Sequence, residues 1–395
     1  MKTELYSISK IFTERLLRIP DYQRGFAWTD KQLKDFWTDL LQIEKGHNHY
    51  VGVLTLENVH EDKYSQWNDD LWIIRSKNYE PFFVVDGQQR LTTTVILIQC
   101  ILEAINAQEI NYTKPDEIRK KFIFESKDEG ISRSYLFGYE SDNPSYEFLK
   151  QRIFCEQSDN QAHVQETIYT NNLLNAKEIF TEFLKDMELI DIEALYSKVT
   201  QNLLFNIYSM SDEIDVHVSF ETMNNRGKPL SHLELLKNRL IYLSTKVSSD
   251  GFEKIKLRNA INMCWKTIYH QLGRNKDNPL DDDTFLFNHF ILFFGNDISN
   301  GNRINYRRFR RSYSTYYQDY LLEKKFTTKS LYSDGDDKLT IPELYKYVSS
   351  LKSSVEKWYE ISNPKGSSLD TEISFWLEKI NRAGVDECLP SFDHG

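Results

Sequence analysis

Residues 82–93 read Phe-Phe-Val-Val-Asp-Gly-Gln-Gln-Arg-Leu-Thr-Thr, and this stretch decides the fold class that the sequence predicts. Four apolar residues predict a buried strand, and a tight turn with a glycine follows. The run from Gln88 to about Asn106 then keeps the apolar period of a helix. A strand that leads through a short turn into a helix is typical of α/β domains. We therefore expect an α/β domain built around this segment.

The start of the predicted helix suits a phosphate group. Its first N–H groups lack partners within the helix and carry a partial positive charge. Gly87 lets the backbone approach a ligand closely, and Arg90 can bind two phosphate oxygens at once. Further hydrogen-bond donors on the same segment are Gln88, Gln89 and Thr92. The alternative is that Asp86 only caps the helix and Arg90 only forms a salt bridge.

A second polar loop, residues 18–28, precedes a helix that we expect to begin at Thr29. Tyr22 can stack on a base, whereas Gln23 and Arg24 can bind a phosphate or a base edge. The neighbouring apolar aromatic residues are expected to pack in the core instead. This loop is therefore a second candidate for ligand contact.

A third polar loop, residues 221–229, follows an alternating strand pattern at 213–220 and precedes a capped helix that begins after Ser231. Asn225 and Arg226 offer amide and cationic donors there. The alternative is an ordinary polar turn.

The rest of the chain predicts two further strands, at 49–57 and 71–75, and mainly helix from about residue 145. We expect amphipathic helices near 252–272, 283–295, 303–323, 341–360 and 368–382. The predicted fold class is α+β, with an α/β nucleotide-binding domain at 1–130 and a mainly helical domain at 131–395.

Composition and charge exclude several classes of protein. The 395 residues carry a net charge of −10, which excludes a global positive field that would attract DNA or an anionic membrane. Four cysteines lie far apart without a CxxC pair, which favours reduced thiols in a cytosol. No signal peptide and no apolar run of about 18 residues is evident. We therefore expect a cytoplasmic protein with no membrane contact.

One local basic stripe stands out against this acidic background. On a helix, four arginines would share one face beside aromatic residues, as in a DNA-binding surface. They are Arg303, Arg307, Arg310 and Arg311. The alternative is a solvated face paired with acids elsewhere in the chain.

Taken together, IPDYQRGFAW, VVDGQQRLTT and FETMNNRGKPLSHLELLKN resemble the N-terminal domain of GmrSD-type, modification-dependent restriction proteins of phage defence. The resemblance implies a ParB/sulfiredoxin-like α/β fold followed by a helical domain. It also implies binding and hydrolysis of a nucleoside triphosphate, often GTP, coupled to the sensing of modified DNA. Carried onto this chain, the catalytic residues would be Asp86, Gln89 and Arg90. Asp86 would also hold Mg²⁺, a hard cation that prefers carboxylate oxygen.

The chain departs from complete members of this family because it has no His-x-x-P element of an HNH-type nuclease. We therefore expect a sensor whose nuclease is a further domain or a separate subunit, and a homodimer remains an open alternative. A second hypothesis is a non-catalytic DNA-binding module that reads modified DNA. A sulfiredoxin-like reductase is rejected, because Gln88 and Gln89 occupy the region where its nucleophilic cysteine would be needed.

Overall fold

The computed structural model describes residues 5–127, 132–141, 143–155, 166–210, 230–298, 316–333 and 338–382. The described chain forms two compact units, one up to Met210 and the other from Leu230 onward. The predicted boundary at 130/131 lies inside the first unit. The reason is that two strands after residue 131, Phe137–Tyr139 and Leu203–Met210, belong to the main sheet and the helices between them pack on the same core.

The first unit is built on a mixed six-stranded sheet with the order β1-β8-β3-β4-β2-β7. Strand β2 runs parallel to both β4 and β7, whereas β3 runs antiparallel to β4 and parallel to β8. Two further strands, β5 and β6, form an antiparallel pair. The strands are β1 (Leu5–Ser7), β2 (Arg15–Ile19), β3 (His49–Asn58), β4 (Glu80–Asp86), β5 (Phe124–Lys127), β6 (Ser132–Tyr135), β7 (Phe137–Tyr139) and β8 (Leu203–Met210).

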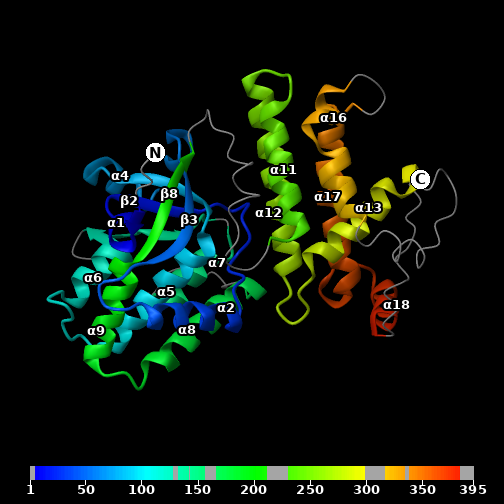
Figure 1. Ribbon diagram of the computed structural model, residues 1–395. Helices are drawn as coiled ribbons and strands as arrows, with labels where there is room; N and C mark the ends of the chain where they lie inside the picture. Colours follow the sequence, from blue (N-terminus) through cyan, green and yellow to red (C-terminus); the bar gives the residue numbers. More distant parts are fainter. Residues whose placement is uncertain are drawn as a thin grey trace. The chain divides into compact units, whose positions relative to one another are not determined.

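Helices α5, α8 and α9 gather on one side of this sheet (Figure 1). Helix α5 is buried on nearly every side from Leu91 to Leu102, and the helix predicted from Gln88 is confirmed. The helical segments of this unit are α1 (Ile8–Ile11), α2 (Asp30–Gln42), α3 (Glu61–Tyr64), α4 (Leu71–Lys77), α5 (Gln88–Ala104), α6 (Pro115–Phe122), α7 (Ser145–Phe148), η2 (Leu149–Ile153), α8 (Ile168–Leu184), α9 (Leu189–Ser197) and η3 (Lys198–Asn202).

Two sequence predictions differ from the structure. The predicted strand at 71–75 is helix α4, because a short apolar run does not distinguish a strand from a helix by its pattern. Strand β8 was not predicted, since it lies within a region that reads as helical. Its pairing with β3, about 150 residues earlier in the chain, is a long-range contact that no local pattern reports. The predicted strand at 213–220 lies outside the described residues.

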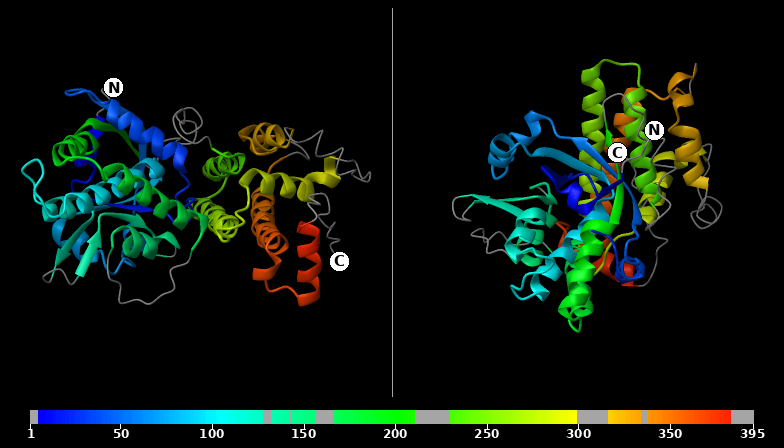
Figure 2. Two further views of the ribbon diagram at one scale, coloured as in Figure 1. Left: turned by 90° about the horizontal axis from the view of Figure 1, so that it is seen from below. Right: turned by 60° about the vertical axis from the view of Figure 1, so that its left-hand side comes forward.

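The second unit is helical, as predicted (Figure 2). Its described helices pack around an apolar core of their own. Its segments are α11 (His232–Lys246), α12 (Gly251–Gly273), α13 (Asp282–Ile298), α15 (Tyr316–Asp319), η4 (Tyr320–Lys325), α16 (Thr328–Tyr332), α17 (Ile341–Ser362), η5 (Pro364–Gly366) and α18 (Thr371–Arg382). The fold class, a mixed α/β domain followed by a helical domain, is therefore confirmed. In the part of the chain that the structure describes, no helix is long and apolar enough to cross a membrane.

Candidate functional site

Two polar segments meet at one edge of the sheet. Strands β2 and β4 are parallel neighbours, with Arg18 opposite Phe83, so the segments that follow them leave the sheet at the same edge. One is the loop from Pro20 to Thr29, which we call the YQR loop. The other is Gly87, which leads directly into α5. The carboxyl ends of parallel strands are where α/β proteins usually bind ligands.

Gly87 makes the turn between β4 and α5 possible. Its φ is +84°, in the left-handed region that side chains disfavour. A Cβ added at this position would lie 3.0 Å from the carbonyl oxygen of Val53 and 3.1 Å from a methyl carbon of Leu54. The glycine is therefore required both by conformation and by the close approach of β3.

The two glutamines of the Asp-Gly-Gln-Gln-Arg segment bind the YQR loop directly. Gln88 Nε2 donates to the carbonyl oxygen of Arg24 at 3.1 Å. Gln89 Oε1 accepts from the amide of Ala27 at 2.8 Å, and its Nε2 donates to the carbonyl oxygen of Gly25 at 3.1 Å. The oxygen and the nitrogen of the Gln89 side-chain amide thus both bind the YQR loop. Two of the three predicted motifs thus join into one structural unit, in which Gln89 holds the YQR loop.

Other elements hold the YQR loop as well. Gln23 Nε2 donates to the carbonyl oxygen of Val85 at 3.0 Å, so the loop also binds the end of β4. From α8, Asn172 Nδ2 donates to the carbonyl oxygen of Phe26 at 3.0 Å. Such multiple anchoring gives a loop with a defined shape, which is the condition for selective binding.

The guanidinium of Arg90 binds strand β3. Its two terminal nitrogens donate to the carbonyl oxygens of Val51 at 2.8 Å and Val53 at 3.2 Å, and the Asp86 carboxylate lies 4.0 Å away. A Cβ added at Gly52 would lie 1.9 Å from one of these nitrogens, so the guanidinium packs directly on that glycine. Arg90 therefore ties α5 to β3 in this structure, whereas the sequence predicted that it binds phosphate.

The other predicted residues differ in how accessible they are. The side chain of Asp86 is 25 % exposed at the end of β4, and Tyr22 is half-buried. Arg24 is 9 % exposed. Thr92 is buried at 1 % exposure, close to the phenol of Tyr139, and cannot touch a ligand without rearrangement of α5. Of the predicted set named here, Asp86 and Tyr22 are thus the more accessible side chains, whereas Arg24 is largely buried within the YQR loop.

Several predictions concern segments that cannot be compared with the structure. Asn225 and Arg226, and the stripe of Arg303, Arg307, Arg310 and Arg311, lie outside the described residues. Among the residues that are described, no three His, Cys, Asp or Glu side chains group as a metal site would require. The expected core packing of the aromatic residues in the YQR loop is confirmed by Phe26 and Trp28, at 0 % and 7 % exposure.

Sequence reasoning missed the residues that support the site from a distance. Gly52 carries a weak signal, because a glycine inside a strand pattern often marks a close approach. Asn172 carries no such signal in the sequence, because it lies almost 150 positions after the YQR loop that it binds.

This arrangement defines an α/β protein in which a polar loop is bound by the first turn of a helix at the carboxyl ends of two parallel strands. Residues 8–241, more than half of the chain, match the family of the GmrSD restriction endonuclease N-terminal domain. The chain belongs to this family, and the protein is accordingly a component of a restriction system, a form of phage defence directed at DNA. No curated protein shows significant similarity to the chain.

Proposed function

We propose that the corner formed by the YQR loop and the start of α5 binds a nucleoside triphosphate. The observation that supports this proposal is that Gln88 and Gln89, in the first turn of a long buried helix, hold the YQR loop against the start of that helix. The backbone N–H groups of its first turn and the partial positive charge there favour a phosphate group. The preference for GTP, the hydrolysis and the coupling to modified DNA rest on the family resemblance.

We assign roles to these residues that differ from those the sequence predicted. Arg24 would contact the phosphates and Tyr22 would stack on the base, because both belong to the loop that closes the corner. Gln89 and Arg90 would position the loop and the helix without touching the nucleotide. Their side chains already bind backbone groups of the protein.

Asp86 suits a magnesium ion that a nucleotide brings with it. Mg²⁺ typically takes one or two carboxylates and completes its coordination with phosphate oxygens and water. Asp86 offers a partly exposed carboxylate at the end of β4, next to Gly87. When bound, the ion would neutralise charge on the phosphates, while Asp86 itself would fix the ion beside the helix N-terminus.

Isothermal titration calorimetry with GTP, ATP and CTP in the presence of Mg²⁺ tests this proposal. We expect Tyr22→Ala to weaken nucleotide binding roughly tenfold, since stacking on a base contributes about 1–3 kcal/mol. Tyr112→Ala is the matched control, because the Tyr112 side chain is 99 % exposed and far from the YQR loop in sequence. No heat of binding with any nucleotide, or equal affinities for the two variants, would refute a nucleotide site at this corner.

One observation favours the second candidate, a DNA-binding module without hydrolysis. Arg90, Gln88 and Gln89 are engaged with backbone groups, which leaves fewer donors for a triphosphate than the sequence suggested. A gel-shift assay with modified and unmodified DNA in the absence of nucleotide distinguishes the two candidates. Discrimination between the DNAs without nucleotide, together with no NTP turnover, would favour the binding module.

We also propose that DNA cleavage belongs to a further domain or subunit. The sequence has no His-x-x-P element of an HNH nuclease, so the residues named above would sense rather than cut. Release of phosphate without DNA cleavage by the isolated chain would support this division of roles.

A further inference from the structure

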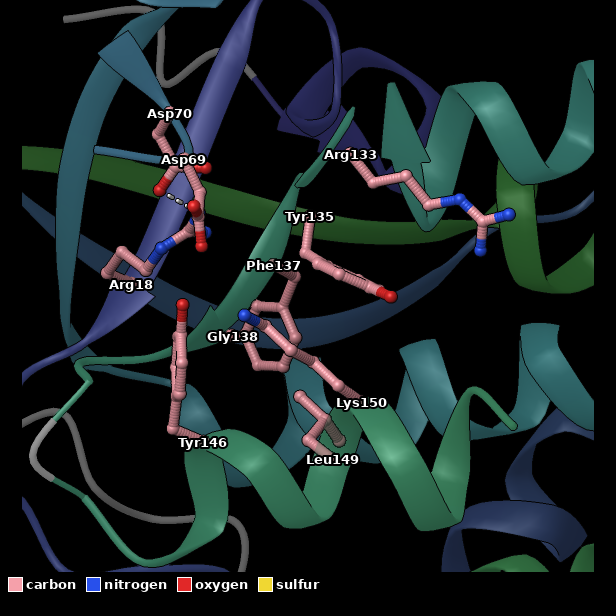
Figure 3. A pocket seen from close by; sticks show the side chains of 10 residues that line it. All are labelled: Arg18, Asp69, Asp70, Arg133, Tyr135, Phe137, Gly138, Tyr146, Leu149 and Lys150. Atoms are coloured by element: carbon pink, nitrogen blue, oxygen red, sulfur yellow. Dashed lines mark hydrogen bonds and ion pairs between the residues drawn. The ribbon is translucent and has the colours of Figure 1, made fainter. Parts of the chain in front are cut away.

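The lining of a small polar hollow in the first unit carries charges of both signs (Figure 3). Arg18 donates to the Asp70 carboxylate at 2.6 Å. Lys150 Nζ lies 3.7 Å from the ring centre of Tyr146, and the carboxylates of Asp69 and Asp70 line the same hollow. The protein itself thus supplies counter-charges there, and the hollow gives no reason to expect a ligand.

Helix α18 of the second unit lies beside the end of α17 and binds its own unit through polar side chains (Figure 1). Asn381 Nδ2 donates at 2.8 Å to a carbonyl oxygen in the last turn of α17. Glu378 forms an ion pair with Lys365 at 2.9 Å, and Ser374 Oγ donates to the carbonyl oxygen of Pro364 at 3.4 Å. Positions 374, 378 and 381 share one side of a helix, so the side that α18 turns to its unit is polar.

A different side of α18 carries apolar side chains that remain exposed. None of the residues of this helix is buried. Ile373, Trp376 and Ile380 are 51 %, 54 % and 37 % exposed, and their spacing of three and four residues places them in one stripe along the helix. We call this surface the α18 stripe. An amphipathic helix normally buries its apolar stripe, so the orientation of α18 leaves a surface that suits a protein partner.

Trp376 is the largest side chain of the α18 stripe, and neighbouring groups hold it in place. Its ring lies 5.5 Å from that of Phe375 in an edge-to-face arrangement. Lys379 Nζ lies 4.9 Å from the ring centre of Trp376 and 4.2 Å from that of Phe375. An aromatic side chain that is already held loses little conformational freedom on binding, which suits the anchor of an interface.

The charges that border the α18 stripe make it complementary to itself. Glu372 directly precedes Ile373, and Lys379 directly precedes Ile380, so the two charged residues lie along the same edge of the stripe. They are seven positions apart and do not face each other as residues three or four apart do. If two copies of α18 pack antiparallel, Glu372 of each copy lies beside Lys379 of the other. The two helix dipoles are then opposed, which is also favourable.

We propose that the α18 stripe pairs with the same stripe of a second copy of this chain, in an antiparallel arrangement with Trp376 near its centre. Such an interface is isologous, so each contact occurs twice. The helix has 12 residues and is about 18 Å long, which is short for a stable interface. We therefore expect a reversible dimer with a dissociation constant in the micromolar range. The inference concerns the second unit and does not depend on nucleotide binding.

Analytical ultracentrifugation of the full chain over a range of concentrations tests the proposal. We expect a monomer–dimer equilibrium for the wild-type chain. Trp376→Glu should weaken it at least about thirtyfold, as the loss of an interface anchor does. Phe252→Glu is the matched control, because Phe252 is a 74 % exposed aromatic residue at the start of α12, and this variant should dimerise like the wild type. Equal urea midpoints of the three proteins would show that the fold is intact.

Exchange of the two bordering charges tests the antiparallel pairing. Glu372→Lys alone and Lys379→Glu alone would each bring like charges together and should weaken the dimer about tenfold. The double variant restores opposite charges and should regain the wild-type dissociation constant. A wild-type chain that stays monomeric at about 100 μM would overturn the proposal and leave the α18 stripe to a different protein. A dimer that Trp376→Glu does not weaken, or a double variant as weak as the single variants, would also overturn it.

Discussion

The contact of Arg90 with β3 leads to a prediction that separates a structural role from a ligand-binding role. Arg90→Ala removes two hydrogen bonds from a charged donor and leaves the carbonyl groups of Val51 and Val53 without this partner. Hydrogen bonds to charged groups contribute about 1.5–3 kcal/mol each, and the Arg90 side chain is only 13 % exposed, so we expect a local loss of about 3 kcal/mol. Gly52→Ala should have a similar effect, because the added Cβ would displace the guanidinium.

Hydrogen exchange followed by mass spectrometry measures this loss locally. A reduction of about 3 kcal/mol raises the exchange rate of amides in β3 and at the start of α5 roughly 150-fold. Exchange in α17, which belongs to the other compact unit, should stay unchanged and serves as the internal control. The local readout is needed because a chain of two units need not unfold in a single step.

The opposite result is also well defined. If Arg90→Ala left exchange in β3 unchanged but abolished the heat of GTP binding, the guanidinium would bind phosphate as the sequence predicted. The contacts with β3 would then be a resting arrangement that the ligand replaces. Faster exchange with intact nucleotide binding would instead establish Arg90 as a positioning residue.

Two further predictions concern buried titratable groups. Burial lowers the pKa of His289 from 6.5 to about 3, so the unfolded chain binds a proton that the folded chain does not. The second unit should therefore lose about 1.4 kcal/mol of stability per pH unit as the pH falls from about 6.5 towards 3, and His289→Phe should flatten this slope in urea titrations. Burial also raises the pKa of Cys100 and Cys264 to about 12, whereas Cys155 is exposed. Peptide mapping after brief iodoacetamide treatment should show Cys155 modified before Cys100 and Cys264, and faster labelling of Cys100 would contradict the described burial.

Local patterns in the sequence predicted much of this fold. The helix after Gly87, the helix of residues 30–42 and the cap at Ser231 are all present. Each depends on residues within a few positions of one another, such as a serine that accepts from an amide three residues later. The prediction of a strand at 71–75 was wrong because it also relied on a local pattern. A run of five residues is too short to show whether its apolar period is that of a strand or of a helix.

The sequence by itself determined that residues 86–90 follow a strand and that both polar segments, residues 18–28 and 86–90, precede helices, since turn and cap residues act locally. Only the tertiary structure decided which partners the side chains of those segments bind. In the structure, the side-chain oxygen and nitrogen of Gln89 both bind the YQR loop, and Arg90 binds carbonyl groups of β3. Lys150 lies beside tyrosine rings that come from other elements. These contacts join residues far apart in the chain, and their geometry depends on strand order and packing, which no local pattern encodes.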